Sequence, residues 1–465
     1  MPDGRTALRD RSRGATLLST LLAGFLLALY SFGPVRSSSP PPTIGPEPAS
    51  LVIGQSNFTT FASANGPGGL SEPEFVAFDS SGDLWVSDYN DSLVAEYRAP
   101  FTTGEAASLE LGSASFSTTG CANAGPGNVC SPNGFAFDPS GNLWVTDNQN
   151  YSIVEFKAPF TPGESVSTVI GGPSEVDGAV SATTLGEVYG IAFDASGNLW
   201  VADSIDDRVL EFKAPLGSGE AASLVLGQPT LTSVKNDDAQ SNMSGPEDMA
   251  FDRSGNIWVA DTDDSRVLEF SQPFSDGEKA SMVIGEPDYT SIAGNDTRSA
   301  LTLPEGIAFD PSGDLWVADS GNSRVLEFAA PFSPGMDASD LIGQDSYFSG
   351  GPNATQTGLG YPQGIAFDPS GNLWVADPGF SRVLEYSDPL AYTSGPATTG
   401  SSTTTPVATT ISTSSSSSGG GVPVLPYQLP IAAVFMVLLV ATYLLVRRRV
   451  APPTGPAGQS PSGSV

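Results

Sequence analysis

The chain has 465 residues, with 51 aspartates and glutamates against 19 lysines and arginines, and a formal net charge of -32 at pH 7. So acidic a surface repels a phosphate backbone, which argues against nucleic acid as a partner. The chain contains no histidine, which excludes a Ser-His-Asp triad and a histidine-ligated zinc site.

The N-terminal segment carries four arginines followed by an apolar run from Ala15 to Tyr30. A basic region followed by a hydrophobic stretch of this length is typical of a signal peptide. Residues 1–36 are therefore predicted to be a signal peptide. The alternative is an uncleaved membrane anchor, because no cleavage site stands out. Residues 37–48 are predicted to be a Pro/Ser-rich linker.

Six near-copies of one unit fill residues 49–390. Each unit contains one of the six tryptophans, which lie 56 to 59 residues apart: Trp85, Trp144, Trp200, Trp258, Trp316 and Trp374. A fixed period of this kind is the signature of a repeat architecture. Each unit also offers four short segments rich in β-branched and aromatic residues; in the fifth unit they are 306–310, 315–318, 324–328 and 338–343. Four antiparallel strands, repeated six times, predict an all-β, six-bladed β-propeller.

The fourth-strand motif is missing after the sixth unit, but a stray copy, Ala49–Gly54, precedes the first unit. We expect this N-terminal strand to complete the sixth blade. Pairing of the first strand with the last blade closes the ring and leaves no open sheet edge.

The C-terminal part changes composition twice. Residues 391–424 are rich in serine and threonine and are predicted to form an extended stalk. Leu429–Val446 contains no charged residue and is followed at once by Arg447, Arg448 and Arg449. This pattern predicts a transmembrane helix with a basic stop within residues 425–449, with a buried core helix as the alternative. The positive charge places the tail, residues 450–465, in the cytoplasm and the propeller outside the cell.

The repeated unit reads Phe-Asp-x-Ser-Gly-[Asn/Asp]-Leu-Trp-Val-Ala-Asp, then four residues and Arg-Val-Leu-Glu-Phe. It resembles the NHL repeat over residues 49–390. Arg208, Arg266, Arg324 and Arg382 keep the pattern, whereas the first unit has Leu93 and the second Ser152. The resemblance implies a six-bladed propeller. It implies less about activity, because the family includes protein-binding modules, nucleic-acid binders and a few hydrolases and lyases, and the enzymes generally depend on histidine or a bound metal.

Strand parity decides which loops share a face. The loops between second and third strands and the blade-to-blade loops should lie together on one face, the top face. The turns between first and second strands should lie on the bottom face, from which the stalk leaves. We therefore expect the top face to point away from the membrane.

Acidic and amide side chains gather in the top-face loops. The candidate ligand-binding residues are Asp206, Asp207, Asp263, Asp264 and Asn322. Clustered carboxylates hold Ca²⁺ or receive a basic partner; the alternative is solvated acid on an acidic protein.

One aspartate recurs in all six units and is predicted to be structural, meeting in four units the arginine five residues on: Asp88, Asp147, Asp203, Asp261, Asp319 and Asp377. The Asp-x-Ser-Gly-[Asn/Asp] segment has a faint likeness to a calcium loop, but it lacks the distal glutamate of an EF-hand, so a hairpin turn is favoured. The tryptophans are expected to pack between blades rather than to stack on sugars.

Cys121 and Cys130 are the only cysteines. In an exported protein they predict a local disulfide, with two free thiols as the alternative. Six sequons mark glycosylation candidates at Asn57, Asn90, Asn150, Asn242, Asn295 and Asn353.

These observations favour a membrane-anchored, cell-surface propeller that acts as a binding module for an extracellular protein, glycan or cation, with no catalytic residue assigned. The alternative is a metal-dependent propeller enzyme, such as a lactonase or lyase, with Ca²⁺ held in the central channel. A third interpretation is envelope structure without a discrete ligand. An enzyme should show an asymmetric set of inward-pointing Asp, Asn or Glu; a module should show near-equivalent blades and a broad exposed loop face.

Overall fold

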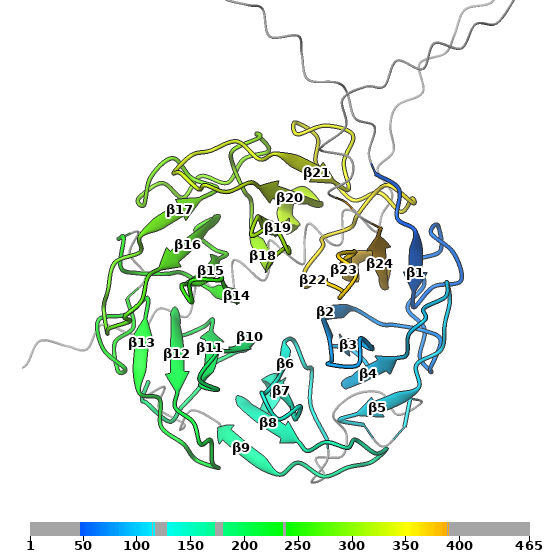
Figure 1. The fold of residues 1–465 in the computed structure, drawn as a ribbon, viewed down its shortest axis with the longest axis horizontal. Coiled ribbons are helices and arrows are strands. Elements are labelled where there is room, and N and C mark those ends of the chain that lie inside the picture. Colours follow the sequence, from blue (N-terminus) through cyan, green and yellow to red (C-terminus); the bar gives the residue numbers. More distant parts are fainter. Residues whose placement is uncertain are drawn as a thin grey trace, which may run out of the picture. The chain divides into compact units, whose positions relative to one another are not determined.

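The computed structural model describes residues 47–387 and 389, apart from 114, 117–127, 173–179 and 236–238. Six four-stranded antiparallel sheets are arranged around a central axis (Figure 1). In each sheet the first strand lies nearest the axis and the fourth lies at the rim. The fold is therefore the six-bladed β-propeller that the repeats predict.

The strands follow the repeats closely. Blades one to three contain β2 (Pro73–Phe78), β3 (Leu84–Asp88), β4 (Leu93–Tyr97), β5 (Leu109–Leu111); β6 (Phe135–Phe137), β7 (Leu143–Asp147), β8 (Ser152–Phe156), β9 (Thr168–Gly171); and β10 (Val188–Phe193), β11 (Leu199–Asp203), β12 (Arg208–Phe212), β13 (Leu224–Leu226). Blades four to six contain β14 (Pro246–Phe251), β15 (Ile257–Asp261), β16 (Arg266–Phe270), β17 (Met282–Ile284); β18 (Pro304–Phe309), β19 (Leu315–Asp319), β20 (Arg324–Phe328), β21 (Asp340–Ile342); and β22 (Ile365–Phe367), β23 (Leu373–Asp377), β24 (Arg382–Tyr386) with β1 (Leu51–Ile53). Single 3-10 turns occupy Asn148–Asn150, Ser320–Asn322 and Pro378–Phe380.

The N-terminal strand closes the ring as expected. β1 pairs antiparallel with β24, with Leu51 opposite Glu385, Val52 opposite Leu384 and Ile53 opposite Val383. The last blade is thus completed by the first strand of the chain, and the two lie side by side in Figure 1.

The tryptophans pack between neighbouring blades. Each indole is buried and meets edge-on a phenylalanine from the first strand of the next blade. The ring centroids are 5.7–6.1 Å apart in the pairs Trp85–Phe137, Trp144–Phe193, Trp200–Phe251, Trp258–Phe309, Trp316–Phe367 and Trp374–Phe78. Edge-to-face aromatic pairs add to the burial of apolar area. Because the last pair joins blade six to blade one, this packing also runs around the full ring.

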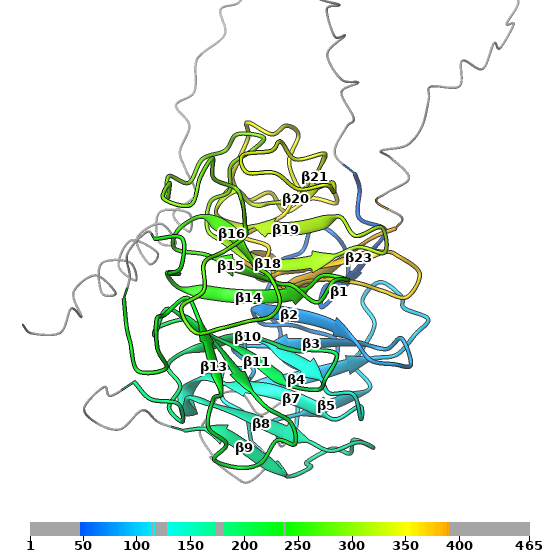
Figure 2. The same ribbon diagram turned by 60° about the vertical axis from the view of Figure 1, so that its left-hand side comes forward.

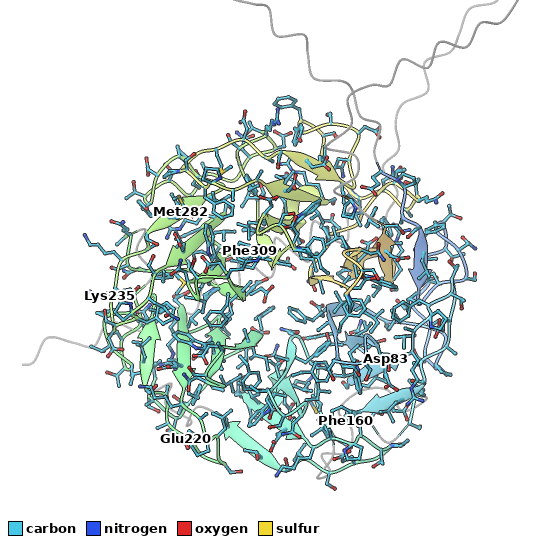
Figure 3. The ribbon with its side chains drawn as sticks, viewed as in Figure 1. Asp83, Phe160, Glu220, Lys235, Met282 and Phe309 are labelled. Carbon is cyan, nitrogen blue, oxygen red and sulfur yellow. The ribbon has the colours of Figure 1, made fainter. Side chains whose placement is uncertain are left out.

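Side chains from neighbouring blades fill the space between the sheets, and Phe309 is labelled among them in Figure 3. The antiparallel pairing of every strand with its neighbour places the second-to-third loops and the blade-to-blade loops at the same ends of the strands, which Figure 2 shows from the side. The top and bottom faces are therefore those that strand counting predicts.

The predicted signal segment (1–36), the stalk (391–424), the apolar segment (425–449), the tail (450–465) and Cys121 lie outside the described residues. Within the described part of the chain, no helix has the length and apolar character needed to cross a bilayer.

Candidate functional site

A buried arginine anchors the top face in blades three to six. Arg208, Arg266, Arg324 and Arg382 are fully buried. Each Nε donates to the aspartate five residues earlier, at 2.8 Å to Asp203, 2.6 Å to Asp261, 2.6 Å to Asp319 and 2.7 Å to Asp377. The predicted Asp–Arg pairing in four units is confirmed.

The same guanidinium holds two long loops. Arg208 Nη2 donates to the Thr184 carbonyl (2.9 Å) in the loop before the blade, and Nη1 donates to the Leu231 carbonyl (2.7 Å) in the loop after it. The other oxygen of Asp203 accepts the backbone N–H of Gly186 at 2.8 Å. Charge-assisted hydrogen bonds of this kind are stronger than neutral ones, so the blade-to-blade loops are fixed by the core of the blade.

The predicted ligand-binding residues lie in top-face loops, but in separate blades and with their polar groups engaged. Asp206 and Asp264 accept from the arginine two residues on, at 3.3 and 2.9 Å. Asp207 Oδ1 accepts the N–H of Gly245 (2.9 Å), which links blades three and four. Asn322 Nδ2 donates to Asp319 Oδ2 at 2.9 Å and to the Asn295 carbonyl at 3.0 Å.

Asp263, the fifth predicted residue, is half-buried, and its backbone N–H donates to the Ser244 carbonyl at 3.1 Å. Burial raises the pKa of the Asp206 carboxyl, and the Arg208 charge opposes that rise. The five residues thus shape the loops in which they lie and do not converge on one point.

A second polar site, which the sequence analysis missed, lies at the axis. In each blade the residue four positions before the phenylalanine that ends the first strand lines a central cavity of about 30 Å³. These six residues are Glu74, Asn133, Tyr189, Glu247, Glu305 and Gln363. They occupy one register position in six otherwise similar units, yet their chemistry differs. Three are glutamates, so the channel is asymmetric in charge.

Burial governs the electrostatics of this channel. Burial, together with the charge of Glu74, raises the pKa of Glu305 to about 8, while hydrogen bonds from Ser320 and Gln363 oppose the rise. The pKa of Glu74 is raised mainly by burial and further by the charges of Glu72, Glu247 and Asp88. The raised pKa of Glu305 favours its protonated form, which lowers the repulsion across the axis.

Asp248, also at the channel, joins two blades. Its Oδ2 accepts the N–H of Ile307 in blade five at 2.9 Å, and its Oδ1 accepts the N–H of Met249 at 2.7 Å. Its side chain fills the space beside Gly190, where a Cβ would lie 2.7 Å from Asp248 Oδ1. Burial raises the pKa of this carboxyl to about 7.

The channel is too small for the organic substrate that the enzyme alternative requires. A cavity of about 30 Å³ has room for water or a single ion, not for an organic substrate. Within the described residues, trios of carboxylates with oxygens inside 4.8 Å of one another occur at Asp79–Asp83–Glu96 and Asp310–Asp314–Glu327, both away from the axis.

The six glycosylation candidates all fall in top-face loops. Five are exposed, whereas Asn242 is buried at 4 % exposure, so a glycan at Asn242 would require its loop to open. Cys130 is disulfide-bonded; the chain's other cysteine, Cys121, lies outside the described residues.

Comparison with known proteins connects the repeats to one family. The model described as "NHL repeat" matches residues 129–156, 243–270 and 301–328. Peptidyl-glycine alpha-amidating monooxygenase B from Xenopus laevis is 25% identical over 156 residues, 31% of this chain and 17% of that protein. Teneurin-3 from Danio rerio is 25% identical over 368 residues, 70% of this chain and 12% of that protein. The chain thus spans less than a fifth of the length of either relative.

Among solved structures, virginiamycin B lyase from Staphylococcus aureus is similar over 72% of this chain and 87% of that chain, with 13% identity and a TM-score of 0.41. So distant a likeness says nothing about activity. The three matching segments each carry a tryptophan-centred unit, so the chain contains NHL repeats.

Proposed function

We propose that this chain is a membrane-anchored, cell-surface propeller that binds an extracellular partner through its top face. The observation that carries the proposal is the position of the exposed large apolar side chains. Six of the seven exposed large apolar side chains in the described residues lie in top-face loops: Phe61, Tyr151, Ile205, Val234, Ile292 and Phe348. The seventh, Val169, lies on strand β9.

The length of the top-face loops supports the same conclusion. The blade-to-blade loops run to roughly 20 residues without a strand of their own, a length at which loops in compact domains are usually functional or disordered. Here the buried arginines fix loops on both sides of blades three to six. A loop that is already ordered loses less conformational entropy on binding.

The charge of the chain indicates the kind of partner. Exposed apolar side chains suit the centre of a protein interface, and a net charge of -32 favours a basic rim on the partner. We therefore propose a basic extracellular protein as the partner, ahead of a glycan or a free cation. The basic residues after the apolar C-terminal segment support a cytoplasmic tail and an external propeller.

The test uses cells that carry the full chain with a photo-crosslinking amino acid at position 348, 205 or 169. We expect crosslinked adducts from Phe348 and Ile205 on the top face and none from Val169 on β9. Externally added protease should degrade the propeller and spare the tail. Equal adducts from positions 169 and 348, or a protected propeller, would overturn the proposal.

The second candidate function, a propeller enzyme, is favoured by the asymmetric set of glutamates at the axis. The small cavity counts against it, and among the described residues no trio of carboxylates at the axis has oxygens within 4.8 Å of one another. A hydrolytic activity toward lactones or esters that disappears in Glu305→Gln would favour the enzyme over the binding module.

A further inference from the structure

The bottom-face hairpin of each blade brings three polar side chains together. In blade four these are Asp252, Asn256 and Glu269. The Asn256 amide nitrogen donates to Asp252 Oδ2 and to Glu269 Oε1, both at 2.9 Å, and so bridges two carboxylates. Blade three repeats the arrangement, with Asn198 Nδ2 at 2.8 Å from Asp194 and 3.3 Å from Glu211. The glutamate missing from a calcium-loop pattern in the sequence is thus supplied by the third strand.

Blades one and five have aspartate, Asp83 and Asp314, in place of that asparagine. The bridging N–H groups are replaced by an oxygen that only accepts. In blade one, where Asp83 is labelled in Figure 3, Glu96 pairs with Arg98, with Nη2 and Oε2 3.2 Å apart. The chain therefore provides a cation of its own beside the extra carboxylate of blade one.

Blade five has no such cation. Ala329 stands where blade one has Arg98, and a further acid, Asp340, stands where blade four has Met282, labelled at the rim in Figure 3. Asp340 is directly opposite Glu327 in the β20–β21 pairing. Like charges directly opposite each other destabilise a sheet, so this cluster of four carboxylates lacks a counter-charge from its own blade.

Arg253, from the neighbouring blade, donates to the Pro311 carbonyl. None of the ion pairs within the described residues joins this arginine to the four carboxylates.

One buried oxygen in this cluster has no partner. Asp310 is only 3 % exposed; its Oδ1 accepts the N–H groups of Ser312, Gly313 and Asp314 at 2.7, 2.8 and 3.0 Å. Its Oδ2 accepts nothing, and the indole N–H of Trp316 also has no acceptor. In the other five blades the indole donates to this aspartate oxygen at 3.3–3.4 Å. A buried carboxylate oxygen left without a partner is costly.

We propose that the blade-five cluster of Asp310, Asp314, Glu327 and Asp340 binds one divalent cation, with Ca²⁺ the best match to its hard oxygen ligands. Oxygens of Asp310, Asp314 and Glu327 already lie within 4.8 Å of one another. The backbone N–H of Ala330 donates to Asp314 Oδ1, and the Ser339 hydroxyl donates to Glu327 Oε2. The other oxygen of each carboxylate is left for the ion. The cation takes the place of the amide that bridges two carboxylates in blades three and four, and water completes a shell of about six to eight oxygens.

The test is calorimetric titration of the chelator-treated full chain with CaCl2, compared with Asp314→Asn. Asparagine stands at this position in four other blades, so the variant is expected to fold. We expect a saturable Ca²⁺ site in the wild type, at least tenfold weaker binding in Asp314→Asn, and a higher melting temperature for the metal-free variant than for the metal-free wild type. Equal Ca²⁺ affinity in the two proteins would overturn the proposal.

Two further variants locate the ion. Asp83→Asn makes the same change in blade one and should leave Ca²⁺ affinity unchanged, whereas Asp340→Leu removes only the fourth carboxylate and should weaken binding several-fold. Loss of the site in Glu305→Gln, with binding retained in Asp314→Asn, would place the ion at the axis and overturn the blade-five site. Because the cluster lies on the bottom face, its failure would leave the proposed top-face function untouched.

Discussion

Blades three to six and blades one and two place the same buried aspartate at the end of the second strand, but they neutralise it differently. In blade six, Arg382 lies 2.7 Å from Asp377, and the pKa of Asp377, raised by burial and lowered by that arginine, is about 6. Blade one has Leu93 in the paired position, and burial, with the charge of Asp91, raises the pKa of Asp88 to about 8. Blade two uses an amide instead: Asn150 Nδ2 donates to both oxygens of Asp147, at 3.0 and 2.9 Å.

The comparison separates two roles of this position. The aspartate itself is needed in every blade, because its carboxylate accepts a backbone N–H from the preceding loop in all six: Ser71, Cys130, Gly186, Ser244, Thr302 and Gly360. The arginine is needed only where two blade-to-blade loops are also tied to it. The repeat therefore fixes the start of each blade, and the arginine fixes the loops of the top face.

The largest effect should come from removing one arginine. Arg266→Ala leaves Asp261 buried without its counter-charge, and breaking a buried ion pair on one side costs about 3–5 kcal/mol. Chemical denaturation of the full chain measures this loss. Ser152→Ala, at the matching position of blade two, should stay within about 1 kcal/mol of the wild type. Equal losses in the two variants would mean that the arginine is not the anchor.

The next effect concerns the Asn150 amide, which takes the place of the arginine beside the buried aspartate of blade two. Asn150→Ala removes both hydrogen bonds to Asp147 and should destabilise the chain by about 1.5–3 kcal/mol, the range for hydrogen bonds to a charged group. The control is Asn90→Ala in blade one, an asparagine of the equivalent loop whose side chain interacts with Glu72; it is expected to change the free energy of unfolding by less than Asn150→Ala does. A larger loss in the control would contradict the comparison.

A third expectation concerns pH. The folded-state pKa of Asp88 is about 8, above its ordinary value of 3.8, so the folded protein binds this proton more tightly than the unfolded chain does. The stabilisation is fully present below about pH 4 and is lost as the pH rises through 8, by at most about 1.4 kcal/mol per pH unit. Unfolding free energies between pH 6 and 9, compared between the wild type and Leu93→Arg, measure this slope. A slope that is the same in both would show that Asp88 is not its source.

The smallest effect is a gain. Leu93→Arg places a guanidinium opposite Asp88, in the register that joins Asp203 to Arg208. We expect a stabilisation of about 1 kcal/mol at pH 8, because the new ion pair is offset by the lost burial of leucine. Thermal melting at pH 8 measures it; a lower melting temperature than the wild type would show that the blade-one loops cannot supply the carbonyl partners.

The sequence was sufficient for the architecture because the informative residues recur. Six tryptophans at one period predict six blades, and the stray strand Ala49–Gly54 predicts the closure by β1. The Asp–Arg pairs were predictable for the same reason, since Asp203 and Arg208 are five residues apart and their spacing repeats in three further blades.

The axis and the bottom-face cluster were not predictable from recurrence, since both depend on where the repeats differ. Glu74, Asn133 and Glu305 occupy one register position. The only sequence signal for them is that the residue type at this position differs between otherwise similar units. Asp314 and Glu327 are 13 residues apart and meet only because of the cross-strand pairing in blade five. The candidates Asp206 and Asp264 were placed on the right face, but their use by the neighbouring arginines needed side-chain geometry.

The seam at β1 has a mechanical consequence. Residue 47 and residue 387 approach the same blade through two neighbouring antiparallel strands joined over three residue pairs. A load applied between these two points pulls β1 and β24 apart from one end of their pairing. The hydrogen bonds between the two strands therefore break one after another instead of sharing the force. Under tension the ring would part first between β1 and β24, while the five blades built from continuous chain stay intact.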